Sequence, residues 1–276
     1  MATSPRREAW DLYASGMVAK RSSPNPKKDK AARRRRPSRP PLSPARGGTV
    51  LTAAGLAEGM VLASGVRIRA ARPDDVETVR RLIALTGSGV NLDGALAAAV
   101  TEGRLSAAVM KGLAEGPDAL TYEMAVAASP EGEGSVEELV IGLTCVLVAE
   151  HPGVGVVGTL LALPPARMLS NIGIPDMESL VGLLKVVKLK AVAVDPAHRG
   201  ARIAAALIAA CRQLYTLLGY LLLYGQFEVG SGLETYYQRQ GLTVLKEGQG
   251  VPLTMFSVPA AIYTEPTERF FACDLA

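Results

Sequence analysis

Residues 194–204 read VDPAHRGARIA, and they carry the most information about the fold. An apolar strand is expected to end at Val194, a proline turn follows, and a loop of small residues opens a long helix. The free N–H groups in the first turn of a helix point outward, and the helix dipole adds partial positive charge there. The small residues let a phosphate approach the backbone, and Arg199 and Arg202 add charge. The stretch therefore predicts an anion site, with an ordinary strand-to-helix turn as the alternative.

The segments on either side of this stretch predict a mixed α+β protein. The run VVKLKAVAV predicts a strand at 186–194, and a one-sided apolar pattern predicts the helix 202–218. LTYEMAVAA and LVIGLTCVLVA predict a hairpin of strands at 120–128 and 139–149. Further strands are expected at 66–71, 154–163, 221–227, 242–245 and 254–258, and further helical pieces at 74–86, 92–102, 106–114, 167–184 and 233–240.

Three segments, in this order, resemble the GNAT family of acyl-CoA N-acetyltransferases, over roughly residues 66–258. VRIRAARPDD at 66–75 resembles the opening strand and helix of the family. RGARIA at 199–204 resembles its motif Arg/Gln-x-x-Gly-x-Gly/Ala, although Arg202 stands where the family usually has Gly. A bulky cation fits there if its backbone stays in the helical region. ETYYQRQGL at 234–242 resembles the late motif in which a Tyr precedes a Gly by four residues. The resemblance implies a GNAT-like mixed, mostly antiparallel twisted sheet flanked by helices.

The resemblance also implies acetyl-CoA as co-substrate and assigns roles to residues. Tyr237 would be the general acid that protonates the departing CoA thiolate, because a phenol and a thiol have comparable pKa values. The alternative is that Tyr237 only packs its helix onto the sheet. Among the carboxylates near strand ends, Glu150 is the favoured candidate for the general base, and Glu138, Asp195 and Glu228 are the others. The implied cofactor-binding residues are Ala193, Val194, Arg199, Gly200, Ala201, Arg202, Ile203 and Ala204, with the N–H groups near the first two holding the thioester carbonyl.

The cysteines and histidines do not suggest a metal. His151 and His198 lie far apart in sequence, and the three cysteines show no CxxC spacing. Three cysteines also exclude a disulfide scaffold for a chain of 276 residues. No metal is expected to take part in the reaction.

The charge is concentrated at the N-terminus. Residues 1–50 hold 13 Lys and Arg against three acidic residues, a balance of +10, whereas the other 226 residues have a balance of −6. We therefore expect a disordered basic tail at 1–63, which includes a short helix at 6–20, and a GNAT-like domain at 64–276. Residues 20–46 could bind nucleic acid or an anionic surface, act as an organellar transit peptide, or have no specific partner. A further hypothesis is that translation starts near Met60 and omits the tail.

The function expected from the sequence is transfer of an acetyl group from acetyl-CoA to a primary amine, by direct attack in a ternary complex. The acceptor is unidentified, and the acidic body favours a cationic amine. Two alternatives from other classes are a non-catalytic acyl-CoA-binding module and a nucleic-acid-associated protein acting through its tail. We expect a cytoplasmic protein without a membrane span, because the apolar run 203–227 fits a buried helix and strand better. A homodimer is left open.

Overall fold

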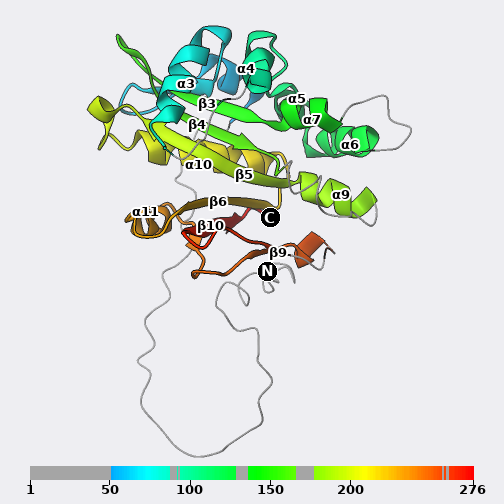
Figure 1. Ribbon diagram of the computed structural model, residues 1–276. Helices are drawn as coiled ribbons and strands as arrows, with labels where there is room; N and C mark the ends of the chain where they lie inside the picture. The colour runs from blue at the N-terminus through cyan, green and yellow to red at the C-terminus, as the bar shows by residue number, and fades with distance from the viewer. Residues whose placement is uncertain are drawn as a thin grey trace, which may run out of the picture.

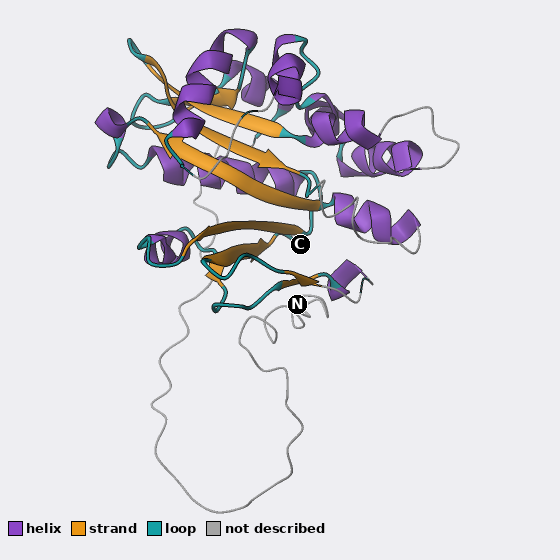
Figure 2. Cartoon of the chain, viewed as in Figure 1, coloured by secondary structure: helices purple, strands orange, loops and turns teal. Residues whose placement is uncertain are grey.

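A computed structural model describes residues 51–87, 92, 94–128, 136–165, 177–256, 258 and 261–276. Its helices and strands confirm the mixed α+β class (Figure 1, Figure 2). The α-helices are α2 (Ala53–Glu58), α3 (Val76–Ala84), α4 (Gly94–Thr101), α5 (Ala107–Glu115), α6 (Pro117–Ala128), α7 (Val136–Leu143), α9 (Met177–Leu184), α10 (Ile203–Leu217) and α11 (Leu233–Arg239). The strands are β1 (Met60–Val61), β2 (Arg67–Ala70), β3 (Cys145–His151), β4 (Gly155–Leu163), β5 (Val186–Val194), β6 (Leu222–Glu228), β7 (Thr243–Val244), β8 (Val251–Pro252), β9 (Ala261–Ile262) and β10 (Glu268–Asp274). Short 3-10 turns are η1 (Pro73–Asp75), η2 (Pro196–His198) and η3 (Thr254–Phe256).

Eight strands form one mostly antiparallel sheet in the order β1-β2-β3-β4-β5-β6-β10-β7, and β8 and β9 pair separately. The pair β5–β6 is parallel, and every other described pair is antiparallel. The connection between β5 and β6 is α10, as a parallel pair requires a crossover. This is the GNAT-like sheet flanked by helices that the sequence predicts.

The two faces of the sheet are covered by different elements, because side chains alternate along each strand. On β3, Leu147 faces the large core cluster that includes α10, whereas Val146 and Val148 face a cluster with α3 and α4. On this second face, the β6–β10 half of the sheet is covered instead by the segment of β8, η3 and β9. In Figure 1, α3 and α4 lie on the opposite side of the sheet from α10.

The predicted hairpin at 120–128 and 139–149 is wrong in its first strand and in half of its second. Residues 117–128 form α6, which begins with Pro117 and buries Leu120 and Met124 one turn apart. Tyr122 and Val126 are exposed on its other side, so apolar residues on both sides resembled a strand. The run 139–149 divides at Thr144, whose hydroxyl bonds the Val140 carbonyl at the end of α7 before β3 begins. Periodicity does not separate a buried helix from a buried strand within one apolar run.

The C-terminal prediction is also corrected. Residues 254–256 form the turn η3 rather than a strand, and the last strand of the chain is β10, which lies between β6 and β7 and comes after the last predicted strand, 254–258. Its inward-facing residues Phe271 and Cys273 alternate with Phe270 and Ala272 on the other face. The C-terminal residues therefore form an inner strand of the sheet, between β6 and β7.

The predicted domain start at residue 64 lies too late. Leu51 and Leu56 are buried in the main core, the Thr52 hydroxyl caps α2 by accepting from the Gly55 N–H, and β1 pairs with β2. The folded part thus extends back to the first described residue. The helix expected at 6–20 and most of the tail expected at 1–63 lie outside the described residues, as does 167–176, the first part of the helical segment expected at 167–184. Across the described ranges, no helix has both the length and the apolarity to cross a membrane.

Candidate functional site at the split between β5 and β6

The parallel strands β5 and β6 pair over only part of their length. Their register runs from Val186 opposite Leu222 to Leu189 opposite Gly225, yet β5 continues to Val194 and β6 to Glu228. The separation begins at a bulge in β5, because Leu161 and Ala162 of β4 face Ala191 and Leu189 and leave Lys190 as an extra residue. A bulge bends its strand and increases its twist. We call the region where the strands continue without pairing the β5–β6 split.

The loop that the sequence predicts to bind an anion, which we call the anion loop, follows Val194 at the end of β5 and leads into α10 at Ile203. The Asp195 carboxylate accepts a hydrogen bond from the Ala197 N–H at 3.1 Å and forms an ion pair with Arg81 at 3.3 Å, which holds η2 in place. These two bonds keep the pKa of Asp195 below its ordinary value. Arg199 donates through Nε to the Val194 carbonyl at 3.4 Å. Residues 199–202 are exposed.

The N-terminus of α10 lies against the sheet at this loop. Ile203 is 3% exposed and faces Gly158 of β4, where a Cβ atom would lie 2.9 Å from the Ile203 side chain. The Ala206 N–H bonds the Arg202 carbonyl at 3.0 Å, so the N–H groups of the preceding helical residues have no acceptor within the helix. Such groups are available to an anion. The structure therefore brings Val194 and residues 199–204 together at one end of β5.

Arg202 differs from its expectation in one respect. Its backbone has φ 60° and ψ 18°, which is left-handed and not the helical conformation that a bulky residue prefers. The position thus has the geometry that suits the glycine of the family motif, and this chain places an arginine there. The left-handed conformation costs an ordinary residue about 1 to 2 kcal/mol.

Tyr237 lies on α11 and contacts β6 and β10, the strands on the side of the split away from β5. Its ring stacks on Phe271 with centroids 3.9 Å apart, and its centroid lies 5.4 Å from that of Phe227, which is on the part of β6 that pairs with β10 but not with β5. Burial, with a smaller contribution from Tyr236, raises the pKa of Tyr237 to about 12. The hydroxyl is therefore a weaker acid than the phenol of pKa near 10 expected from the sequence. Tyr236 is half-buried rather than exposed, and its hydroxyl oxygen has no hydrogen-bond partner among the described residues.

Glu150 is placed elsewhere. It lies at the end of β3, with β4 and β5 between it and β6, and accepts hydrogen bonds from Arg69 at 3.2 and 3.5 Å. Arg69 also forms a buried pair with Asp75 at 2.5 and 3.0 Å. The hydrogen bond from Arg69 lowers the pKa of Glu150, and burial opposes it more weakly. The structure does not bring Glu150 together with Tyr237.

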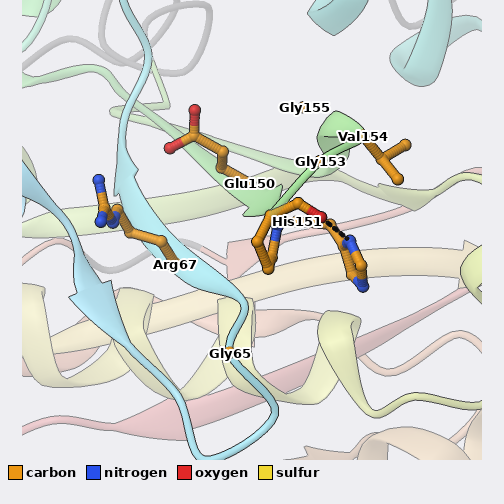
Figure 3. A pocket seen from close by; sticks show the side chains of 8 residues that line it. Gly65, Arg67, Glu150, His151, Gly153, Val154 and Gly155 are labelled. Carbon is orange, nitrogen blue, oxygen red and sulfur yellow. Dashed lines mark hydrogen bonds between the residues drawn. The ribbon is translucent and has the colours of Figure 1, made fainter.

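Glu150 lines a pocket of about 350 Å³ with Arg67, His151 and the turn that joins β3 to β4. Figure 3 shows Arg67 and Glu150 on adjacent strands and His151 beyond them, bonded through Nδ1 to the Pro152 carbonyl. The His151 ring lies 5.4 Å from that of His198, which immediately precedes the anion loop. The two histidines are thus neighbours, which their sequence separation did not suggest. Across the described residues, no three His, Cys, Asp or Glu side chains form a group that could hold a metal.

Sequence reasoning missed three polar side chains, which we call the polar strip: Lys188, Gln226 and Glu268. Lys188 Nζ donates to Gln226 Oε1 at 2.7 Å, and Gln226 Nε2 donates to the two Glu268 carboxylate oxygens at 2.8 and 2.7 Å. The strip crosses β5, β6 and β10 next to the split. The short apolar run FFAC at 270–273, bounded by charged residues, is the signal that could have identified its third strand.

The fold and the site together define an α+β protein in which the parallel strands β5 and β6 diverge and the anion loop follows the carboxyl end of β5. No protein-family model and no curated protein sequence matches the chain. Solved structures do match it, and several of them are named as acetyltransferases. Ard1 from Thermoplasma volcanium is 14% identical, with a TM-score of 0.40 over 76% of this chain and 98% of that one. A GNAT-family acetyltransferase from Staphylococcus aureus is 12% identical, with a TM-score of 0.41 over 76% and 99%.

A third match is the diaminobutyrate acetyltransferase EctA from Paenibacillus lautus, solved with L-2,4-diaminobutyric acid and coenzyme A. It is 16% identical, with a TM-score of 0.40 over 76% of this chain and 95% of that one. The GNAT family named among these structures is the one that the three sequence motifs resemble.

Proposed function

We propose that this chain is a GNAT-type acyltransferase that moves an acetyl group from acetyl-CoA to a primary amine by direct attack in a ternary complex. The observation that carries the proposal is the coincidence of two features at one end of β5. The strand separates from β6 after Leu189, and the open N-terminus of α10 follows Val194 with its arginines. In open parallel sheets ligands bind at the carboxyl ends of the strands, and β5 and β6, joined through α10, are the parallel pair of this sheet.

Three parts of acetyl-CoA, the pantetheine arm, the pyrophosphate and the thioester, have matching groups in this arrangement. The split leaves backbone N–H and C=O groups of β5 without a partner in β6, and these suit the amide-rich pantetheine arm. The N–H groups of α10, with Arg199, suit the pyrophosphate, and small residues at 200, 201 and 204 let it approach. The N–H groups near Ala193 and Val194 would hold the thioester carbonyl and stabilise its oxyanion.

Tyr237 would supply the proton for the CoA thiolate when the C–S bond breaks. A pKa of about 12 keeps its hydroxyl protonated throughout the neutral range, so the acid form is always present. A Tyr237→Phe variant keeps the ring stacked on Phe271, and we expect kcat to fall about 100-fold. Tyr236→Phe is the matched control, since it removes a neighbouring hydroxyl and should keep its rate. Equal rates for both variants and the unchanged chain would remove Tyr237 from the mechanism.

The first experiment is calorimetric titration of the full chain with acetyl-CoA. Binding should weaken about tenfold in Arg199→Ala, because one charged contact to phosphate contributes roughly 1.5 kcal/mol or more. Arg80→Ala, which removes an exposed arginine of α3 that pairs with Glu77, should bind as the unchanged chain does. Absence of binding by acetyl-CoA and by longer acyl-CoA esters contradicts the proposal.

The acceptor class is tested by release of free thiol with a panel of amines. Glucosamine, spermidine, a lysine-containing peptide and 2,4-diaminobutyrate represent an aminosugar, a polyamine, a basic peptide and a small diamine. The −6 balance of residues 51–276 favours these cationic acceptors. Binding of acetyl-CoA without thiol release would instead identify a non-catalytic binding module.

A further inference from the structure

The polar strip lies on the face of the sheet opposite Tyr237. Cross-strand partners share a face, and Tyr224 of β6 lies opposite Ala272 of β10. Tyr224, Phe270 and Ala272 belong to one apolar cluster. Gln226 lies two residues after Tyr224 on β6, and Glu268 lies two residues before Phe270 on β10, so both share the face of this cluster. Phe227 and Phe271, which contact Tyr237, face the other way with α10 and α11.

On its own face, the strip lies between two separate apolar clusters. One cluster joins α3 and α4 to β3, β4 and β5, and the other joins the β8–β9 segment to β6 and β10. All three strip residues are half-buried, and Lys188 also lies 5.9 Å from the Tyr224 ring centroid. The strip therefore separates the two apolar clusters on this face of the sheet, and it lies next to the point where β5 and β6 separate.

Lys188 fixes which way the Gln226 amide points. A lysine ammonium only donates, so the amide oxygen must face Lys188 and the NH2 group must face Glu268. Glu268 thus receives its orientation from an uncharged amide, and its carboxylate keeps lone pairs for a further donor. The other charged group on this face of β6 is Glu228, directly opposite Glu268 in the β6–β10 register and exposed.

We propose that the face carrying the polar strip is the acceptor side of the split, and that the Glu268 carboxylate binds the ammonium of the acceptor and takes its proton. The inference rests on the proposed function and adds the side of approach and the base. Acetyl-CoA then approaches from the α10 side, and the amine reaches the thioester carbon through the split from the opposite face.

The proton and bond balance follows from these positions. The ammonium gives one proton to Glu268, and the neutral nitrogen attacks the thioester carbon as the C–N bond forms. The tetrahedral intermediate loses its second nitrogen proton to water and expels the thiolate as the C–S bond breaks. Tyr237 gives its proton to the thiolate and recovers one from water, and Glu268 returns its proton to solvent. The products are the acetylated amine, CoA thiol and one proton.

The test uses the full chain, the amine panel and hydroxylamine, a nucleophile that is already neutral near pH 8. With the panel amine that reacts best, Glu268→Gln should lower kcat/KM about 100-fold, as expected for loss of a general base. With hydroxylamine the loss should shrink to less than about threefold, because no ammonium needs a base. Glu247→Gln, an exposed substitution in the same C-terminal segment, is the matched control and should keep its rate.

A structural role for Glu268 would lower the rate with both kinds of nucleophile alike, and that outcome overturns the inference. A full rate for Glu268→Gln with the panel amine overturns it as well. Acetyl-CoA titration separates this failure from failure of the proposed function, because the variant should bind acetyl-CoA with unchanged affinity. If the unchanged chain binds acetyl-CoA but acetylates no amine of the panel, the proposed acetyl transfer to these amines is wrong. The proposed acceptor side is then wrong as well.

Discussion

Two carboxylates, Glu150 on the β3 side of the split and Glu268 on the β10 side, have opposite surroundings. Glu150 is bound by a guanidinium that also forms a buried pair with Asp75. Glu268 is bound by the amide of Gln226, and no ion pair to it occurs among the described residues. A carboxylate whose charge is balanced by a paired arginine is a weak base. A carboxylate oriented by a neutral amide has no paired cation and can still bind a cationic ligand. The difference indicates that Glu150 stabilises the fold on the β3 side, and it agrees with our proposal that Glu268 on the β10 side serves the reaction.

The largest expected effect is on the β3 side, with Arg69→Met. The substitution leaves Asp75, which is 7% exposed, without its guanidinium partner. Breaking a buried ion pair by removing one partner costs about 3 to 5 kcal/mol, and we expect this loss in the free energy of unfolding. Denaturant unfolding measures it, with Arg80→Met as the exposed control that should change stability by less than about 0.5 kcal/mol. A loss below about 1 kcal/mol for Arg69→Met would mean that this side is not structural.

The next effect tests the closed end of the split, with Gly225→Ala. A Cβ atom there would lie 2.9 Å from the Leu189 carbonyl oxygen and would also clash with the Phe271 ring. We expect a loss of about 1 to 3 kcal/mol, as for overpacking in a core, and a lower rate because Phe271 supports Tyr237. Gly94→Ala is the control, since nothing lies within 4 Å of the added atom. Unchanged stability in Gly225→Ala would show that the strands are looser at this point than described.

A smaller effect of opposite sign is expected at the open end, with Arg202→Gly. Glycine adopts the left-handed conformation without strain, so the free energy of unfolding should rise by about 0.5 to 1 kcal/mol after allowing for its greater chain entropy. Arg199→Gly is a matched control in the same loop, because its φ of −66° is ordinary and glycine should destabilise the fold there. Thermal unfolding of the two variants should therefore shift in opposite directions.

The smallest effect concerns Glu150 itself and depends on pH. Its pKa is lowered in the folded chain, so its ion pair stabilises the fold above the ordinary carboxylate pKa and loses this contribution as the pH falls through the lowered value. Glu150→Gln should cost less than about 1 kcal/mol at pH 7, because the side chain is 32% exposed. The two chains should converge in denaturant unfolding only when the pH falls below the lowered pKa of Glu150. The acetylation rate should stay unchanged, and a 100-fold loss would restore Glu150 as the base.

The sequence predicted the parts of the fold in which one local pattern has one structural solution. The strand 186–194 and the helix beginning at the anion loop were placed to within a residue, because Pro196 and the small residues separate two clear periodicities. The prediction of a strand at 120–128 was wrong because α6 has apolar residues on both sides, and such a helix has no period that distinguishes it from a strand. Tyr237 and the loop could be named from motifs, since their neighbours lie within a few positions.

The polar strip could not be predicted in this way. Lys188 and Gln226 are 38 residues apart, and Gln226 and Glu268 are 42 apart, so only strand register brings them together. The bulge at Lys190 adds to the difficulty, because one extra residue reverses which side chains of β5 face α10. The same holds for the two histidines, whose contact depends on the turn after β3 lying against η2.

The incomplete pairing of β5 also divides this one strand into two dynamic classes. The N–H groups of residues 186–189 that point toward β6 take part in its ladder, whereas those beyond Lys190 that point the same way have no strand partner in β6. Deuterium uptake should consequently be slow along the first half of β5 and fast at alternate positions of the second half, although the residues are contiguous and β4 borders both. A ligand that lies along the open half and acts as a substitute strand would slow the exchange of those alternate amides, and so report its own position residue by residue.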